Sequence, residues 1–316
     1  MSIGSKSAKA RGIVAVVVAA VALATTACST TSPSSSAAAS GGRIVAVGAE
    51  NEYADLIGQI GGPYVDTTAI LSNPNTDPHT FESSPSVAQV VGSAHLVVQN
   101  GLGYDAFMNK IESAAPDPTR RVIDVQTLLG LPDSTANPHL WYRIASMPVV
   151  AQAIGKDLAS LAPAHAGYFH AAVARFDASL APLYAAIASL RAADAGAPVA
   201  TTEPVADYLL EAAGLDNRTP LSFQADIMNG VDPSPEDESI QIGLFTHRQV
   251  KVFVYNQQVT DSLTEVLLSL ALRNHIPVVG VYETMPTPGY DYQSWMVAEV
   301  HALRNALAHG TSAPRL

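Results

Sequence analysis

The chain has 316 residues, of which 48% are hydrophobic and 14% are charged, and its formal net charge is −11. This length allows one large domain or two of ordinary size. The acidic balance argues against nucleic acid as a partner, because phosphate binding requires a basic surface.

The N-terminus has the pattern of an export signal. Lys6, Lys9 and Arg11 precede a run of apolar residues from Ile13 to Ala24, which is too short to span a bilayer but fits the core of a signal peptide. The run ends in TTACS, which contains Cys28, the only cysteine. This segment resembles a bacterial lipoprotein box, which implies lipid on Cys28 and an anchor on the outer face of the cell membrane. An ordinary secretory signal with an incidental cysteine is the alternative, and it also predicts export.

We therefore assign residues 1–28 to a lipoprotein signal peptide and residues 29–42 to a flexible tether. The tether reads STTSPSSSAAASGG, a polar low-complexity composition that cannot form a core. A single cysteine allows no internal disulfide, so burial of apolar residues must stabilise the rest of the chain.

Strand-like and helix-like segments alternate over residues 43–160, which we expect to form an N-terminal α/β lobe. Short β-branched or apolar runs predict strands at 43–49, 64–71, 95–101 and 121–125. Apolar residues at helical spacing, or a position between two predicted strands, predict helices at 52–62, 86–94 and 147–163. Short buried strands separated by helices indicate a mostly parallel sheet covered on both faces.

Residues 161–194 are predicted to form a long connecting helix, because they are rich in alanine and have apolar residues at helical spacing. Pro182 lies in its middle and should kink or interrupt it. The alternation then restarts over residues 195–316, which we expect to form a C-terminal α/β lobe. Its predicted strands and helices are 197–203, 204–215, 250–256, 262–275, 276–283 and 291–310. The sequence thus predicts two Rossmann-like parallel-sheet lobes joined by a long helix.

Four reactive side chains come just after predicted strands, where the loops of open parallel sheets bind ligands. His79 lies in NTDPHTFESSPS and His139 in ANPHLWYR, while Glu203 and Glu283 end two strands of the second lobe. Two imidazoles and two carboxylates that face each other across a cleft suit a divalent metal. The proline before each histidine fixes φ and stiffens the turn, so less entropy is lost when a metal orders the ring.

The motifs DPHTFESSPS and NPHLW resemble those of the metal-specific solute-binding proteins of bacterial ABC transporters, the cluster that delivers manganese or zinc. The likeness covers nearly the whole body and includes QNGLGYDAFMNKI and TTEPVADYLLEAAGL. Glu203 lies five residues before Tyr208, as the ligand does before the aromatic residue in the family, and YETM occupies the place of the segment that carries the fourth ligand. The resemblance implies that a metal is held in the cleft between the lobes by His79, His139, Glu203 and Glu283.

The resemblance also implies a function: a non-enzymatic component of an ABC importer that captures Mn²⁺ or Zn²⁺ outside the membrane. It would deliver the metal to a membrane permease with its ATPase. Carboxylate oxygens favour manganese, whereas zinc importers of the family often have histidine where this chain has Glu203 and carry a His/Asp-rich loop that is absent here. Iron(II) is a third candidate. We expect a monomer with no organic cofactor that touches the membrane only through its lipid.

Two other classes of function remain open at this point. A metal-dependent hydrolase could use the same His/Glu cluster, although the sequence has no H-E-x-x-H helix and no free base beside the expected metal. An adhesin or a metal-storage lipoprotein is the other alternative. Six further side chains are expected behind the ligands or lining the cleft: Trp141, Tyr208, Asp77, Glu82, Tyr282 and Asn256.

Overall fold

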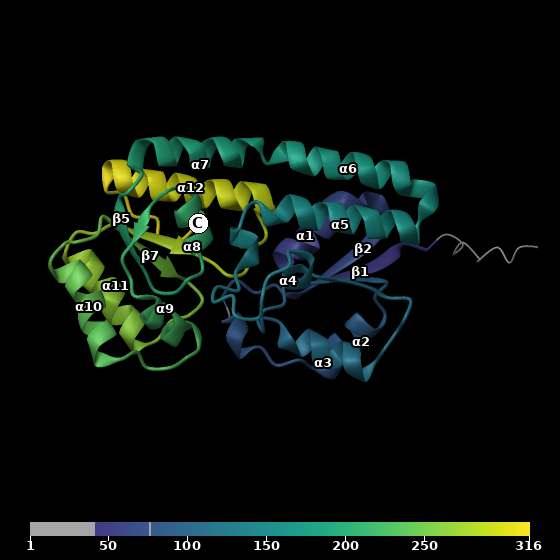
Figure 1. Cartoon of the computed structure of the whole chain (residues 1–316), viewed down its shortest axis with the longest axis horizontal. Coiled ribbons are helices and arrows are strands. Elements are labelled where there is room, and N and C mark those ends of the chain that lie inside the picture. Colours follow the sequence, from purple (N-terminus) through teal and green to yellow (C-terminus); the bar gives the residue numbers. More distant parts are fainter. Residues whose placement is uncertain (1–41, 76) are drawn as a thin grey trace, which may run out of the picture. The chain divides into compact units, whose positions relative to one another are not determined.

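Two four-stranded parallel sheets form the framework of the protein (Figure 1). The computed structural model describes residues 42–75 and 77–316. The predicted signal peptide, Cys28 and the tether up to residue 41 lie outside these described residues. The predicted fold class, an α/β fold with two parallel sheets and a long bent helix, is confirmed.

The first sheet has the strand order β2-β1-β3-β4. Its strands are β1 (Ile44–Glu50), β2 (Val65–Leu71), β3 (Leu96–Gln99) and β4 (Arg121–Asp124). The accompanying helices are α1 (Asn51–Gly61), α2 (Pro85–Gly92), α3 (Ala106–Ala114), α4 (Val125–Leu128) and α5 (Ser146–Leu161). Successive strand residues face opposite sides of the sheet. Ala46 accordingly packs with α1 and α5, while Val47 packs with α2 and α3, so both faces are covered.

The second sheet repeats this order as β6-β5-β7-β8. Its strands are β5 (Pro198–Thr201), β6 (Asp216–Asn217), β7 (Val252–Asn256) and β8 (Val278–Val281). The helices are α8 (Asp207–Ala212), α9 (Leu221–Met228), α10 (Pro235–Thr246), α11 (Ser262–Arg273) and α12 (Tyr292–His309). Phe253 packs with α9, α10 and α11, whereas its neighbours Val252 and Val254 face the core shared with the first sheet.

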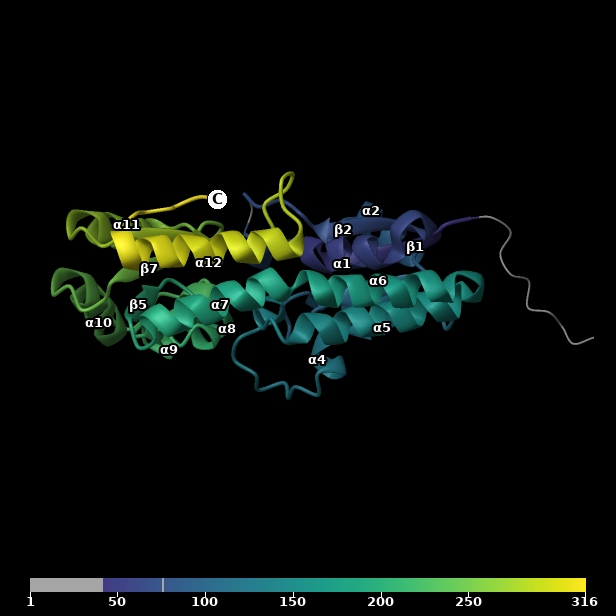
Figure 2. The same cartoon turned by 90° about the horizontal axis from the view of Figure 1, so that it is seen from above.

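The predicted connecting helix is interrupted where the sequence indicated. It consists of α6 (Ala166–Ser179) and α7 (Ala181–Asp194), which meet at Leu180, and Pro182 lies in the first turn of α7. Proline is tolerated there because the first turn of a helix has no use for its missing N–H. By length and composition the stretch could cross a membrane, but α6 packs against α5 and α1 and α7 packs against α12 (Figures 1 and 2). These contacts make it part of the folded body.

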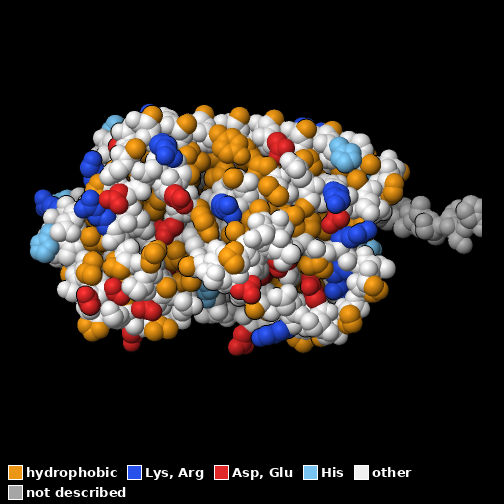
Figure 3. Space-filling model, viewed as in Figure 1, with side chains coloured by type: hydrophobic (Ala, Val, Ile, Leu, Met, Phe, Trp, Pro, Cys, Tyr) orange, Lys and Arg blue, Asp and Glu red, His pale blue; other side chains and the backbone are white. Residues whose placement is uncertain are grey.

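The sheets share one hydrophobic core. A single cluster of buried side chains includes Val98 of β3 and Val254 of β7 together with residues of α5, α7 and α12. The described residues accordingly fall into one compact unit. On the face drawn in Figure 3, acidic and basic side chains are interspersed among uncharged ones.

The C-terminal residues lie along the outer edge of the second sheet. Ala313 forms a parallel bridge with Val279 of β8, with hydrogen bonds of 2.8 Å from Gly280 N to Ala313 O and from Ala313 N to Val278 O. A Cβ atom at position 280 would collide with the carbonyl group of Pro314. The close approach of this segment to β8 therefore requires glycine at position 280.

Candidate metal centre

The site lies where the strand order of the sheets reverses. The two central strands are β1 and β3 in the first sheet, and β5 and β7 in the second. In each sheet the chain leaves one central strand toward one edge and the other toward the opposite edge. The loops at the carboxyl ends of these two strands therefore separate, which opens a crevice. Glu203 lies two residues after β5, and Asn256 is the last residue of β7. The loops after β2, α4 and β8 supply His79, His139 and Glu283.

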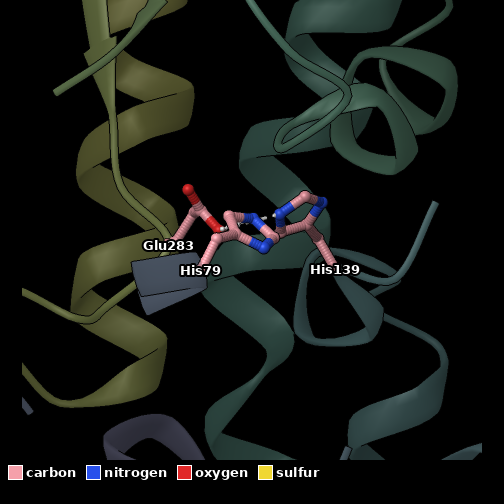
Figure 4. A group of neighbouring side chains, drawn as sticks. All are labelled: His79, His139 and Glu283. Atoms are coloured by element: carbon pink, nitrogen blue, oxygen red, sulfur yellow. Dashed lines mark hydrogen bonds and ion pairs between the residues drawn. The ribbon is translucent and has the colours of Figure 1, made fainter. Parts of the chain in front are cut away.

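His79, His139 and Glu283 come together in this crevice (Figure 4). The Nε2 atoms of both histidines lie 3.1 Å from the same oxygen, Oε2 of Glu283. The side chains of His139 and Glu283 are fully buried, and that of His79 is 24% exposed. With metal–ligand bonds of about 2.0–2.2 Å, neighbouring donor atoms around a tetrahedral ion lie about 3.3–3.6 Å apart. The observed 3.1 Å is close to this range, so a small outward shift would let the three side chains bind one ion.

A rigid turn holds His79. Residues Pro78–Thr80 form a 3-10 turn whose preceding residue is Asp77. The Oδ1 atom of Asp77 accepts a hydrogen bond of 2.8 Å from the backbone N–H of His79. The predicted partner Asp77 therefore fixes the backbone of His79, and Pro78 between them restricts the φ angle of the turn. Glu82 is exposed to solvent.

Asn137 orients the ring of His139. Its Nδ2 atom donates to the carbonyl oxygen of Pro204 at 2.7 Å, so its Oδ1 atom is the acceptor that faces Nδ1 of His139 at 2.8 Å. A neutral His139 thus carries its hydrogen on Nδ1 and a lone pair on Nε2. That lone pair faces Oε2 of Glu283, also an acceptor. Two acceptors 3.1 Å apart require a cation or a proton between them.

Aromatic rings enclose the histidines. Trp141 lies edge-on to His139 with ring centroids 5.4 Å apart, as the sequence predicted, and Tyr208 donates to the carbonyl of Asn137 at 3.0 Å. Tyr104 was not recognised from the sequence as part of the site. Its ring contacts both histidines and its hydroxyl donates to Oε2 of Glu283 at 3.1 Å. The preceding residues, Gly101–Gly103, all have positive φ, so the GLG before Tyr104 was the available signal of a tight loop that carries a functional side chain.

Asn256, the last residue of β7, and Gln258, two residues further on, hold Glu283 in place. The Oε1 atom of Gln258 accepts the backbone N–H groups of Glu283 and Thr284, both at 2.7 Å. Asn256 donates from Nδ2 to Oε1 of Glu283 at 2.7 Å and to Oε1 of Glu203 at 3.0 Å. Glu203 is 2% exposed. Asn256 links it to Glu283, and its oxygens are not among the ligand atoms that lie within 4.8 Å of one another.

Burial and mutual charge perturb the titration of all four groups. Burial lowers the pKa of His139, and the nearby His79 adds to this against the opposing effect of Glu283. Burial also acts to lower the pKa of His79, but the hydrogen bond and charge of Glu283, with Asp77, outweigh it and raise that pKa. Burial acts to raise the pKa of Glu283, but the adjacent imidazoles of His139 and His79 bring it below its ordinary value. For Glu203, burial and then the charge of Glu283 raise the pKa well above normal.

A cavity of about 620 Å³ leads from solvent to His79. Residues 227–233 and 258–263 line it on the side of the second sheet, and Asp77 and Thr80 line it on the side of the first. Asp232 and Asp261 add two further carboxylates to its wall. A cation can therefore approach the site along an acidic path.

Comparisons with known proteins bear on the family and the fold. The sequence profile of the family described as zinc-uptake complex component A, periplasmic, matches residues 47–306. A curated relative from Treponema pallidum is 23% identical over 202 residues, so the match spans 58% of this chain and 62% of the relative.

Among solved structures, the periplasmic zinc-binding protein TroA of Treponema pallidum aligns with a TM-score of 0.70 and 18% identity, over 85% of this chain and all of that one. The solute-binding protein FpvC of Pseudomonas aeruginosa, in complex with Mn²⁺, aligns with a TM-score of 0.69 and 19% identity, over 84% of this chain and 98% of that one. These likenesses show the fold. The profile match covers most of the chain, and the chain therefore belongs to the family of zinc-uptake complex component A, the periplasmic metal-binding components of uptake systems.

Proposed function

We propose that this protein is the extracytoplasmic substrate-binding component of an ABC importer, and that it captures Mn²⁺ or Zn²⁺ and delivers it to a membrane permease with its ATPase. Iron(II) is the third candidate cargo. The observation that carries this proposal is the pair of acceptors formed by Nε2 of His139 and Oε2 of Glu283, 3.1 Å apart in a fully buried position. A divalent cation satisfies both atoms at once.

The ligands that we propose are His79, His139, Glu203 and Glu283. Two carboxylates neutralise the charge of a divalent ion, which lowers the cost of burying it. The Oε2 atom of Glu203 is buried and has no hydrogen-bond partner among the described residues. A metal would give that oxygen a partner, which supports Glu203 as the fourth ligand.

Export and anchoring belong to the same proposal. Lipid on Cys28 would fix the chain to the outer face of the membrane, and the tether of residues 29–42 would let the lobes, residues 43–160 and 195–316, meet the permease. Residues 161–194 would join the lobes, and docking on the permease would separate them enough to release the metal. We propose that the protein acts as a monomer.

The proposal is tested by metal-dependent thermal stabilisation. A metal at about 100 times its Kd stabilises the folded state by about 2.7 kcal/mol. We expect His79→Ala and Glu203→Ala each to abolish the shift in melting temperature that Mn²⁺ or Zn²⁺ produces in the wild type. His301→Ala, which removes an exposed imidazole of α12, should keep the full shift. An unchanged shift in either site variant would refute that residue as a ligand.

Two measurements separate this function from the alternatives. Family membership argues against a metal-dependent hydrolase, and we expect no turnover of esters or peptides by the metal-loaded protein. An adhesin or a storage protein would need no permease. Cross-linking in native membranes should therefore recover the permease with this protein, and cells that lack the protein should take up less metal.

A further inference from the structure

Asn256 is a fully buried amide that joins the two carboxylates of the site. Its side chain is 1% exposed and donates from Nδ2 to Oε1 of Glu283 at 2.7 Å and to Oε1 of Glu203 at 3.0 Å. A side-chain amide has two N–H hydrogens, so each carboxylate receives one. The Oδ1 atom accepts the backbone N–H of Gln258 at 3.0 Å. This bond fixes which end of the amide faces the carboxylates.

The two hydrogen bonds leave one oxygen of each carboxylate without a contact to Asn256. Oε2 of Glu283 lies 3.1 Å from the Nε2 atoms of both histidines, and Oε2 of Glu203 has no partner among the described residues. A carboxylate oxygen has two lone pairs, so an Oε1 that accepts an N–H of Asn256 keeps one. Bidentate binding would have to use that lone pair while the oxygen stays within hydrogen-bond distance of the amide. An Oε1 that moved away would leave a buried N–H without an acceptor, which is costly.

We propose that Asn256 restricts Glu203 and Glu283 to one metal bond each, and so shifts the selectivity of the site toward zinc. This inference rests on the proposed function, because it assumes that both carboxylates bind the metal. One oxygen from each of Glu203 and Glu283, with one nitrogen from each of His79 and His139, makes a set of four donors.

The number of donors decides between the candidate metals. Zinc favours four N, O or S donors in a tetrahedron, whereas manganese favours octahedral, oxygen-rich sites. Carboxylates by themselves favour manganese, as the sequence indicated. A carboxylate that is confined to one oxygen contributes half of its possible donors, so manganese loses more than zinc when Asn256 holds both groups.

The test compares Mn²⁺ and Zn²⁺ affinities in an Asn256→Leu variant. Leucine has the same branched shape and donates no hydrogen bond. Loss of a residue that holds metal ligands weakens metal binding about 10- to 100-fold, and we expect zinc to show this loss. Manganese should lose less, because both carboxylates become free to bind through two oxygens. Competition titrations with a chromophoric chelator should show the ratio Kd(Mn)/Kd(Zn) falling, by about 10- to 100-fold if manganese loses no affinity.

Asn217→Leu is the matched control. Asn217 belongs to the same sheet, and its Nδ2 atom donates to Thr201 and Asp207 rather than to the carboxylates of the site. Its removal should leave the ratio Kd(Mn)/Kd(Zn) unchanged. A ratio that stays unchanged in Asn256→Leu, or that falls equally in both variants, overturns the proposal.

A measurement on the wild-type protein needs no variant to fold. X-ray absorption of the zinc-loaded protein should show four nitrogen or oxygen donors. Five or six donors around zinc would overturn the role of Asn256 and leave the proposed function intact. Failure of the wild type to bind any of these metals would instead refute the proposed function, and the inference with it.

Discussion

Glu299 is a buried carboxyl group on α12 that lies away from the proposed ligands. Its Oε1 atom accepts hydrogen bonds from Tyr142 and Trp295, both at 2.8 Å, and Oε2 has no partner among the described residues. Burial raises the pKa of this group from 4.5 to about 8, against the opposing effect of these hydrogen bonds. Between these two pH values the folded protein therefore holds a proton that the unfolded chain releases.

That difference makes the free energy of unfolding fall as the pH rises from about 4.5 to about 8. Glu299→Gln removes the titration and keeps an oxygen acceptor for Tyr142 and Trp295. We expect the wild type to lose up to about 4 kcal/mol relative to the variant between pH 5 and pH 8, at about 1.4 kcal/mol per pH unit. Urea unfolding of the metal-free proteins at several pH values measures this. Parallel pH profiles of the free energy of unfolding, whatever the constant offset between them, would contradict the prediction.

At the residue scale, the sequence located the candidate site but not the bonds that organise it. His79, His139 and Glu283 could be predicted because the Pro-His motifs and the strand ends are local signals. Asn256 was expected to line the cleft, but its two hydrogen bonds depend on how β7 lies beside the loops after β5 and β8. Tyr104 was missed because its contact with Glu283 joins residues far apart in the chain.

Helix α12 begins with a capping box that can be tested separately from the site. Oδ1 of Asp291 accepts the backbone N–H of Ser294 at 2.8 Å, and Oγ of Ser294 accepts that of Asp291 at 3.1 Å. We expect Asp291→Ala to lower the free energy of unfolding by about 1 kcal/mol, the usual cost of losing such a cap. Glu265→Ala removes an exposed carboxylate from the first turn of α11 without removing a cap, so it should cost less than about 0.5 kcal/mol. If both variants lost the same free energy of unfolding in urea, the loss in Asp291→Ala would come from its charge rather than from the cap.

At the element scale, local chemistry predicted the long strands and helices well. The break in the connecting helix was predicted because proline cannot continue a helical hydrogen-bond ladder. The sequence did not reveal β6, which has two residues, or the helices α3, α4, α9 and α10. β6 is too short for a pattern, and it is positioned by its pairing with β5. Helix α10 buries Gln241, Leu244 and Phe245 but has a strongly charged first turn, which obscures its apolar face.

Asn51 connects the loops of the two sheets. This residue begins α1 and is 5% exposed. Its Nδ2 atom donates to the carbonyl oxygen of Met285 at 2.8 Å, and its Oδ1 atom accepts the N–H of Met285 at 2.9 Å. Both bonds belong to the loop that follows Glu283, so Asn51 ties the first sheet to a proposed ligand on the second.

We expect Asn51→Leu to lower the free energy of unfolding by about 2–5 kcal/mol, because it leaves both backbone groups of Met285 buried without partners. The variant should also bind the metal with lower affinity, and the stoichiometry should stay at one ion per chain. Calorimetry measures both effects. Asn274→Leu serves as the control, since its side chain bonds only within the end of α11, to the carbonyl of Leu270. Full metal affinity in Asn51→Leu would show that the loop keeps its position without this tie.

At the scale of the whole molecule, the sequence predicted two sheets but not that they share one hydrophobic core. Periodicity shows which residues are buried, and it does not show which buried faces meet. The shared core and the Asn51–Met285 bonds come from that meeting. We therefore expect the two halves to unfold in a single transition, although the sequence alone suggested separate lobes.

The segment around Ala313 lies against β8 and protects the edge of that strand. β8 is the outer strand of its sheet and leads directly to Glu283. An uncovered outer strand offers free backbone groups to any other chain that can pair with it. Ala313 occupies that edge, so removal of the segment around Ala313 would open a place where two molecules could join strand to strand.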